Sequence, residues 1–472
     1  MIGHWIGGEE RPSKAGETFE DIDPWAQERR AVVAHGREDD VRDAVAAARR
    51  AFDEGPWPRM GYEERGALLH RLADRIEEHL EELAWADSGD MGKPIADMRA
   101  KDVPRAARNF RFFADHARLA VAERFPMEGG HHAYTRYEPA GVVAAIAPWN
   151  FPLMLETWKV APALAWGNTV VLKPAEDTPS SATLLARLTK EAGLPDGVFN
   201  VVHGFGPGSA GELLVGSPGV DRITFTGESA TGKVIGQAAM ARLVPVSLEL
   251  GGKGANVVFA DADLDNAVSW STKAVFTNAG QVCLAGSRLF VQRPIVKAFV
   301  DRLAESAEAL VVGDPRDERT QIGPLSSEAH YRKVKGFLDE GAGTMVTGGD
   351  VGDGRWQVRP TVITDAPADA RVVREEVFGP VVTVTPFDDE EEVIRMANDT
   401  PYGLNAMLFT ESLSRAHRVA ARLRAGTVWV NCFFVRDLRA PFGGVGESGV
   451  GREGGLYSRE FFTEPKAVVM QL

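Results

Sequence analysis

The chain has 472 residues, of which 44% are hydrophobic and 25% charged, as expected for a globular protein of two or three domains. Its formal net charge of −14 argues against nucleic acid as a partner, because a polyanion is bound by surfaces rich in lysine and arginine. Two cysteines cannot form a disulfide framework and no apolar run could span a membrane, so we expect a cytoplasmic protein without a membrane partner.

The N-terminal third of the chain carries helical patterns. Residues 39–54, 62–88 and 101–120 place apolar side chains three and four positions apart, which predicts amphipathic helices. Residues 125–141 break this rhythm and predict a hairpin or a loop excursion.

From residue 141 onward, short β-branched runs alternate with amphipathic segments. The predicted strands lie within 142–150, 168–176, 197–204, 221–227 and 245–252, and the predicted helices within 152–167, 180–193, 209–216 and 228–240. This alternation is typical of βαβ units, so the sequence predicts an α/β fold with a parallel sheet. In such sheets ligands bind at the carboxyl ends of the strands.

A second α/β region covers about residues 255–433. It includes predicted helices at 295–312 and 328–342 and a predicted strand segment at 371–387. The chain closes on the apolar, strand-like residues 464–472. Such a strand would be adhesive if exposed, and the sequence is equally consistent with pairing to another subunit or with folding back onto its own chain.

Two glycine-rich turns follow predicted strands. "GPGSAG" (206–211) matches the G-x-G-x-x-G dinucleotide fingerprint, but no acidic residue follows at the expected distance, and a plain helix-start turn explains it more simply. "FTGESATGKV" (225–234) matches a triphosphate-binding loop except that Val234 replaces the Ser or Thr that would hold Mg²⁺. A helix N-terminus can still bind a pyrophosphate there, which favours a dinucleotide cofactor over ATP.

Several polar residues are candidates for chemistry. Cys283 lies among small residues at a predicted helix start or tight turn, where a thiolate can be stabilised, although a buried cysteine without a role is the alternative. Cys432 lies in an apolar run and is expected in the core or a pocket wall. Asn150 follows a strand and can donate to an oxyanion. Glu249 ends an apolar strand, as a general base or a strand cap.

Seven stretches together resemble the NAD(P)-dependent aldehyde dehydrogenase family, in the family's order and over almost the whole chain. They are "APWNFP", "VVLKPAEDTP", "ITFTGES", "LELGGKGANVV", "FTNAGQVCLAGSR", "EEVFGPVV" and "PFGGVGESGVGRE". The resemblance implies an aldehyde dehydrogenase-like α/β fold with two Rossmann-like domains, parallel sheets and a small β oligomerisation arm. It implies an NAD-binding domain at 1–119 and 140–250, a catalytic domain at 251–450, and an arm at 120–139 and 451–472.

The resemblance also implies a thiol-based oxidation of aldehydes. Cys283 would attack the aldehyde, and the Asn150 side chain with the Cys283 backbone N–H would stabilise the oxyanion of the thiohemiacetal. Hydride transfer to the nicotinamide would leave a thioester. Glu249 would activate the water that hydrolyses the thioester, and Lys159 matches a lysine implicated in proton relay.

The cofactor expected from the resemblance is NAD. Lys173 and Glu176 match positions that meet the adenosine ribose, and a carboxylate at Glu176 would repel the 2′-phosphate of NADP. Glu228 departs from the serine that many members place beside the pyrophosphate, which puts that contact in doubt. The other expected cofactor residues are Pro148, Trp149, Gly206, Thr226, Gly227, Leu250, Glu376 and Phe378; no metal is expected.

Two arginines bear on the substrate. Arg105 and Arg436 fall where the resemblance puts the two walls of the substrate tunnel, and paired guanidiniums would select an aldehyde that carries a carboxylate. The loop around Arg436 is similar to that of the hydroxymuconic and aminomuconic semialdehyde dehydrogenases. Pairing of Arg105 with Asp102 and of Arg436 with Asp437 is the structural alternative. The apolar part of the tunnel is expected from Phe151, Met154, Trp158 and Phe442.

Other functions remain open at the level of sequence. A general or aromatic aldehyde dehydrogenase would need the arginines only for structure, and a CoA-acylating enzyme would use the same thiol. A non-catalytic, crystallin-like relative is an alternative from a different class. The resemblance further implies a homodimer or homotetramer whose small-molecule partner is an aldehyde.

Overall fold

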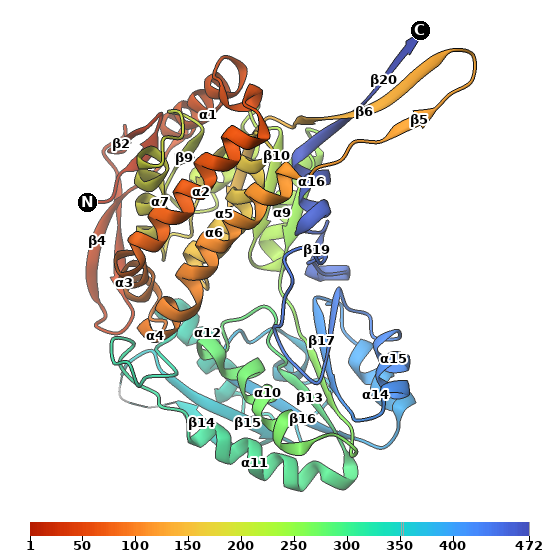
Figure 1. The fold of residues 1–472 in the computed structure, drawn as a ribbon. Helices are drawn as coiled ribbons and strands as arrows, with labels where there is room; N and C mark the ends of the chain where they lie inside the picture. The colour runs from red at the N-terminus through yellow and green to blue at the C-terminus, as the bar shows by residue number, and fades with distance from the viewer. Residues whose placement is uncertain (351, 353, 472) are drawn as a thin grey trace.

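The computed structural model describes residues 1–350, 352 and 354–471, with two large sheets and a projecting arm (Figure 1). Its N-terminal part contains the three helical stretches expected there, of which residues 62–88 form two helices that meet at His79. The helices are α1 (Glu38–Asp53), α2 (Tyr62–Glu78), α3 (Leu80–Met91), α4 (Ile95–Asp97) and α5 (Val103–Arg118).

Four short strands precede these helices and were not predicted from the sequence. They are β1 (His4–Ile6), β2 (Glu9–Arg11), β3 (Thr18–Asp23) and β4 (Glu28–Ala34). β3 and β4 pair with each other, while β1 and β2 extend the edge of the first large sheet. β1 and β2 have three residues each, too few to show an alternation, and in β3 and β4 the apolar and charged residues do not alternate strictly.

The first large sheet has the order β19-β11-β10-β7-β8-β9-β1-β2. Its central strands run parallel, and the fully buried β7 and β8 show the continuous apolar runs typical of a sheet covered on both faces. The strands are β7 (Val142–Ile146), β8 (Thr169–Lys173), β9 (Phe199–Val201), β10 (Arg222–Thr226), β11 (Val246–Glu249) and β19 (Gly449–Val450). The connecting helices are α6 (Pro152–Ala165), α7 (Ser180–Glu191), α8 (Ala210–Gly216) and α9 (Ser229–Met240).

Two apolar clusters cover the first sheet. One contains residues of α2, α5, α6 and α7, and the other contains residues of α1, α8 and α9. Each cluster also takes alternate residues of the same strands: Val143 and Ala145 of β7 belong to the first, Val142 and Ala144 to the second. This two-sided covering confirms the parallel α/β architecture expected from the alternation of strands and helices.

The second large sheet has the order β14-β15-β16-β13-β12-β17-β18 and is parallel except for the edge strand β14. Residues 371–387, expected as strand, begin instead with the short helix α13 (Arg371–Arg374), and only their end forms β16. The strands are β12 (Ala255–Val258), β13 (Arg288–Gln292), β14 (Thr344–Asp350), β15 (Val358–Thr364), β16 (Val381–Phe387), β17 (Asn405–Phe409) and β18 (Thr427–Val430). The helices are α10 (Leu264–Phe276), α11 (Val296–Glu308), α12 (Glu328–Asp339), α14 (Glu390–Asn398) and α15 (Leu413–Ala420).

A three-stranded sheet forms the arm that projects from the body at the upper right of Figure 1. Strands β5 (Arg124–Pro126) and β6 (His131–Pro139) make the expected hairpin, and β20 (Thr463–Gln471) pairs antiparallel with β6. The C-terminal strand therefore folds back onto its own chain after α16 (Gly455–Phe462), while Leu472 lies outside the described residues. We propose the two large sheets and this arm as the cores of the two domains and the arm predicted above.

Short helical turns complete the fold. They are Trp57–Arg59, Met98–Asp102, Thr277–Gly280, Arg293–Ile295 and Gly446–Ser448. The described residues contain no helix that is both long and apolar enough to cross a membrane.

Candidate active site

Four loops of the first sheet meet at the carboxyl edge of its parallel strands. Ile146 at the end of β7 lies beside Lys173 at the end of β8, and Thr226 at the end of β10 lies beside Glu249 at the end of β11. The residues that follow these ends carry most of the predicted cofactor and catalytic positions. The register thus gathers segments that are up to a hundred residues apart along one edge.

A cavity of about 700 Å³ lies over the part of this edge nearest β8. Lys173 is buried, and its Nζ donates to the Pro174 carbonyl at 2.7 Å and to Glu176 Oε2 at 3.2 Å. Gly206 and Gly211 also line the cavity, so the turn that starts α8 borders the same space. A carboxylate and an ammonium at one end suit the hydroxyls of a ribose.

A second cavity of about 340 Å³ continues from the first toward the other sheet. The two cavities share the lining residues Pro148, Trp149, Thr226, Gly227 and Glu228. The second cavity also contains Asn150, Leu250, Cys283, Glu376 and Phe378. All predicted cofactor residues therefore line one two-lobed cleft, which the sequence could indicate only as separate motifs.

The first turn of α9 lies where the two lobes join. Glu228 is the N-cap position of this twelve-residue helix, whose free N–H groups suit a pyrophosphate. Glu376 closes the far lobe, where its Oε1 accepts a hydrogen bond from the Gly252 N–H at 2.8 Å. A ribose subsite, a helix N-terminus and a second carboxylate along one cleft fit an extended dinucleotide such as NAD.

The acidic Glu228 has a basic neighbour from the second sheet. Lys333 Nζ of α12 lies 3.7 Å from Glu228 Oε1, and both residues line the second cavity. His330, one turn earlier on α12, lies 4.9 Å from the Trp149 ring, which in turn meets Phe378 at 5.3 Å. Lys333 and His330 could not be recognised from the sequence, because their helix has the pattern of an ordinary solvated amphipathic segment.

Cys283 follows a strained turn rather than a helix start. Asn278 and Ala279 both have φ of 53°, a left-handed conformation that costs most residues free energy. Gly280 must be glycine, because a Cβ there would lie 2.1 Å from the Gly379 carbonyl oxygen. Burial raises the pKa of the Cys283 thiol to about 12, with smaller contributions from the negative charges of Glu376 and Glu249.

Asn150 contacts the segment that carries the cysteine. Its Nδ2 donates to the Gln281 carbonyl at 2.9 Å, and Asn278 Nδ2 donates to the Asn150 carbonyl at 2.8 Å. A side-chain amide has two hydrogens, so the second one remains for an oxyanion near Cys283. These reciprocal bonds fix the distance between the loop after β7 and the loop of the thiol.

Glu249 is buried at the end of β11, and neither carboxylate oxygen has a hydrogen-bond partner among the described residues. Burial and the nearby charge of Glu453 raise its pKa well above the ordinary value, against the pull of Lys159 and Arg436. A carboxylate whose pKa is raised in this way is a stronger base, once deprotonated, than a solvated one.

Lys159 belongs to a buried polar network next to Glu249. Its Nζ donates to Thr224 Oγ1 at 3.0 Å and to Glu453 Oε1 at 3.2 Å. Glu453 was part of a quoted motif but received no predicted role, because only the fold brings it from the C-terminal segment to α6. Lys159 therefore contacts groups that can pass protons, as the relay prediction requires.

The two candidate substrate arginines lie against one aromatic side chain. The Arg436 guanidinium carbon is 4.6 Å from the centre of the Trp158 ring and 3.8 Å from that of Phe442, and the Arg105 carbon is 5.6 Å from Trp158. Arg105 donates to the neutral Asn109 side chain at 2.9 Å, and Arg436 Nη2 is buried without a partner among the described residues.

The structural alternative for these arginines is not observed. Asp102 pairs with Lys93 at 2.5 Å, and Asp437 pairs with Arg439 at 2.6 Å. Burial, together with the charge of the other arginine, lowers the pKa of Arg105 to about 9, and burial lowers that of Arg436 to about 10. Both shifts follow from guanidinium groups that are desolvated without a carboxylate of their own.

The remaining predicted tunnel residues lie at the start of α6. Phe151 is buried, and the Lys93 ammonium lies 4.0 Å from its ring centre. Met154 is half-buried and packs against the same apolar cluster as Phe151, Phe442 and Cys283. Cys432 is half-buried at the edge of that cluster, as expected for a core or wall residue.

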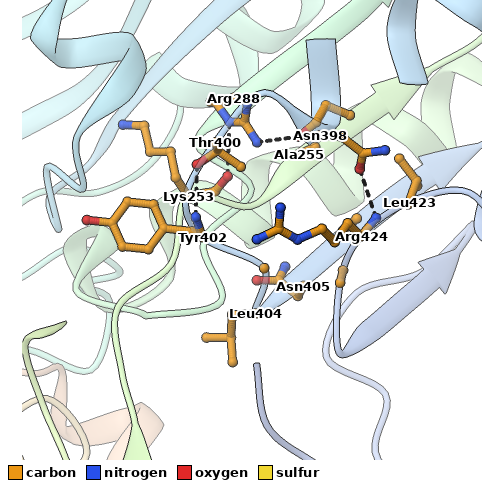
Figure 2. Close-up of a pocket in the computed structure, with 14 residues that line it drawn as sticks. Lys253, Ala255, Arg288, Asn398, Thr400, Tyr402, Leu404, Asn405, Leu423 and Arg424 are labelled. Carbon is orange, nitrogen blue, oxygen red and sulfur yellow. Dashed lines mark hydrogen bonds between the residues drawn. The ribbon is translucent and has the colours of Figure 1, made fainter. Parts of the chain in front are cut away.

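Figure 2 shows a separate pocket that contains none of the predicted site residues. Its free volume is about 10 Å³, enough for a single water molecule. Arg288 donates there to the carbonyls of Lys253 and Ala397 at 3.0 and 2.8 Å, and the Arg424 N–H donates to Asn398 Oδ1 at 2.8 Å. These bonds satisfy loop carbonyls beside the second sheet, so this pocket is structural.

The fold and the cleft define a class of enzyme: an α/β dehydrogenase with a dinucleotide site that ends on a cysteine. The model of the aldehyde dehydrogenase family matches residues 11–468. The chain belongs to the aldehyde dehydrogenase family, and it is accordingly an NAD-dependent oxidoreductase that acts on aldehydes. This confirms the resemblance carried by the seven sequence motifs.

Relatives with assigned activities cover the full chain. The 2-hydroxymuconic semialdehyde dehydrogenase of Pseudomonas sp. (strain CF600) is 49% identical and matches 100% of this chain and 99% of its own. The 2-aminomuconic 6-semialdehyde dehydrogenase of Pseudomonas sp. is 48% identical, with 100% and 97% covered. The benzaldehyde dehydrogenase of Antirrhinum majus is 44% identical, with 99% and 88% covered.

Among solved structures, the NAD⁺ complex of an aldehyde dehydrogenase from Bacillus cereus superposes with a TM-score of 0.97. It is 42% identical, and the superposition covers 100% of this chain and 96% of that one. At this identity and coverage the likeness extends to the whole arrangement of sheets and arm.

Proposed function

We propose that this enzyme oxidises a carboxylate-bearing semialdehyde, such as 2-hydroxymuconic or 2-aminomuconic semialdehyde, through a covalent bond to Cys283. The observation that carries the substrate assignment is the pair of half-buried arginines beside Trp158, neither of which has a carboxylate partner among the described residues. A substrate carboxylate placed between them would remove the repulsion that the two cations exert on each other.

The chemistry proposed for the cleft begins at the thiol. The Cys283 thiol gives its proton to the neighbouring Glu249 carboxylate, and the sulfur attacks the aldehyde carbon. The resulting oxyanion accepts hydrogen bonds from Asn150 Nδ2 and the Cys283 backbone N–H. The residues that line the two lobes of the cleft would hold NAD, which would supply the hydride acceptor for the thiohemiacetal carbon. Cys283 then holds the acyl group as a thioester.

Hydrolysis of the thioester is assigned to Glu249. As a carboxylate it takes a proton from water, and the hydroxide attacks the acyl carbon and releases the acid with the thiol. The network of Lys159, Thr224 and Glu453 lies beside Glu249 and provides a route for the proton to leave the buried site. A CoA-acylating reaction would not need this base.

NAD is preferred over NADP in this proposal because of Glu176. Its side chain is partly exposed to the 700 Å³ cavity, beside Lys173. A carboxylate there accepts hydrogen bonds from both ribose hydroxyls, while a 2′-phosphate would meet its negative charge. The helix N-terminus of α9 supports the pyrophosphate, with Lys333 placed to neutralise Glu228.

The test compares aldehydes with and without a carboxylate. We expect Arg105→Met and Arg436→Met to raise KM for 2-hydroxymuconic semialdehyde by about tenfold or more each, and to change KM for hexanal by less than about twofold. Arg108→Met on the same helix is the matched control, because Arg108 is exposed and loses the same charge. NADH formation is followed for every pair with NAD and with NADP.

Equal losses for both aldehydes would overturn the substrate assignment, and activity with NADP equal to that with NAD would overturn the role of Glu176. The second candidate function is a general or aromatic aldehyde dehydrogenase, favoured by the aromatic wall of Trp158 and Phe442. It predicts a higher kcat/KM for benzaldehyde than for the semialdehyde in the unmodified enzyme.

We also propose that the chain is a cytoplasmic homodimer or homotetramer that associates through its arm. Apolar side chains of the arm are exposed in the single chain, including Phe125 (49%), Met127 (47%) and Val469 (56%). β20 is an edge strand, and no strand among the described residues pairs with its outer side, so it can accept contacts from another copy.

A further inference from the structure

The helices α6 and α7 follow the two ends of the cleft but do not begin with capping side chains. Phe151 precedes α6 and Pro179 precedes α7, and neither provides a side-chain acceptor for the first turn. In the second sheet region, by contrast, Asp263, Ser327, Asp389 and Ser412 cap α10, α12, α14 and α15 themselves. The free N–H groups of α6 and α7 therefore need acceptors from elsewhere.

One turn of α3 supplies both acceptors. The Leu153 N–H in the first turn of α6 donates to Asp87 Oδ2 at 3.1 Å. The Ser180 N–H and Oγ, which begin α7, donate to Asp90 Oδ2 and Oδ1, both at 2.9 Å. α3 contacts both helices, and Asp87 and Asp90 are fully buried three residues apart on it.

The position of these aspartates is unfavourable for α3 itself. They lie near its C-terminal end, where the helix dipole is negative and a carboxylate is destabilising. The same charges are favourable for the N-termini of α6 and α7, which carry the positive end of the dipole. These aspartates therefore stabilise two other helices rather than the helix that carries them, and Asp90 also forms an ion pair with Arg30 of β4.

Both capped helix starts lie next to functional loops. Leu153 is three residues after Asn150, the proposed oxyanion donor, and Ser180 is four residues after Glu176, the proposed ribose acceptor. A helix start whose N–H groups donate to a buried carboxyl of α3 is held against α3, and the loop before it is held with it. Asp87 and Asp90 thereby connect opposite ends of the cleft through a single helix.

We propose that Asp87 and Asp90 are positioning residues for the reaction: Asp90 fixes the ribose loop before α7, and Asp87 fixes the Asn150 loop before α6. For Asp87 the inference rests on the oxyanion role proposed for Asn150. For Asp90 it depends only on cofactor binding, so the two halves can be tested separately.

The experiment uses Asp87 and Asp90 changed singly to Ala and to Asn in the full-length enzyme. NAD affinity is measured by calorimetric titration without aldehyde, and kcat is measured with hexanal at saturating NAD. We expect Asp90→Ala to raise the dissociation constant of NAD about tenfold with kcat changed less than about twofold. We expect Asp87→Ala to lower kcat about tenfold with NAD affinity unchanged within about twofold.

Asparagine keeps an oxygen acceptor of the same shape, so Asp87→Asn and Asp90→Asn should restore most of each loss. Asp40→Ala is the matched control: Asp40 is buried, accepts the N–H groups of Lys14 and Arg37 at 2.9 and 3.0 Å, and lines neither cavity. It should lower the melting temperature without changing NAD affinity or kcat per folded molecule, as judged by circular dichroism and melting.

The proposal requires that Asp90→Ala changes mainly NAD affinity and that Asp87→Ala changes mainly kcat. If Asp87→Ala and Asp90→Ala change NAD affinity and kcat by the same factors, or lower only the melting temperature as Asp40→Ala does, the positioning roles are wrong. Should an alanine variant not fold, its asparagine variant carries the test, and a crossed pattern of smaller size supports the proposal. If the thiol mechanism is wrong, the kcat measurement no longer tests Asp87, but the NAD titration still tests Asp90.

Discussion

The thiol of Cys283 lies in surroundings that suppress its ionisation. Burial raises its pKa to about 12, and the charges of Glu376 and Glu249 add to this effect. Only the thiolate is a strong nucleophile, so the Cys283 thiol is weakly reactive until it loses its proton. The sequence indicated the residue, but its protonation state depends on atoms from several distant segments.

Alkylation of Cys283 by iodoacetamide should therefore be slow at pH 7 and rise about tenfold per pH unit up to about pH 10 in the enzyme without NAD, because the thiolate fraction grows in that proportion below the pKa. The measurement is mass spectrometry of the modified peptide over time in a Cys432→Ser background, which removes the other thiol. A rate that is flat between pH 6 and 9 would contradict a neutral thiol.

Glu249 offers a second prediction at this scale. Its raised pKa means that the carboxylate, the form that acts as base, becomes more populated as pH rises through that pKa, so hydrolysis should speed up in the same direction. Glu249→Gln should lower steady-state turnover by about 100-fold or more while leaving a first burst of NADH. Stopped-flow absorbance separates the two phases; an unchanged steady state would exclude the base.

At the scale of single elements, the turn before Cys283 shows why local sequence rules stop short of the site. The sequence predicts a helix start or a tight turn there, and the structure has a short helical turn with left-handed residues. Asn278 tolerates that conformation better than most residues and also donates to the Asn150 carbonyl. Asn278 therefore has both a left-handed backbone and a side-chain hydrogen bond to a distant loop.

Two substitutions at Asn278 distinguish these contributions. Asn278→Gly accepts the positive φ but loses the bond to Asn150, whereas Asn278→Ala loses the bond and adds about 1 kcal/mol of backbone strain. We expect both to lower kcat similarly, and Ala to unfold at lower denaturant concentration than Gly. Native kcat in the glycine variant would show that the bond to Asn150 does not position the loop.

At the scale of the whole molecule, the two sheets and the arm have different parts in the site and in subunit association. The cleft takes its cofactor edge from the first sheet and its thiol, Lys333 and Glu376 from the second region. The arm projects from this body as strands β5 and β6, and the C-terminal strand β20 pairs with β6. Its exposed apolar side chains are the basis for the proposed association of subunits.

Introducing a charge into the arm tests that association. Val469→Glu on β20 should lower the mass of the particle measured by analytical ultracentrifugation, because a carboxylate is costly to bury in an apolar interface. Gln471→Glu adds the same charge at a polar position of the same strand and should leave the mass unchanged. If Val469→Glu keeps the mass of the unmodified oligomer, or if the unmodified protein has the mass of a single chain, the arm does not form a subunit interface.

The sequence by itself determined the parallel α/β architecture, the nucleophile candidate and the cofactor motifs, because strand and helix periodicity and glycine turns are local properties. It missed β1 and β2, which are too short to show a period, and β3 and β4, whose apolar residues do not alternate with polar ones. It also assigned strand to the residues that form α13. Only the tertiary structure decided that Arg105 and Arg436 have no carboxylate partner in the described part of the chain, that Glu453 reaches Lys159, and that α3 caps two helices. Those contacts join segments separated by up to several hundred residues, and their charges interact only after folding removes the water between them.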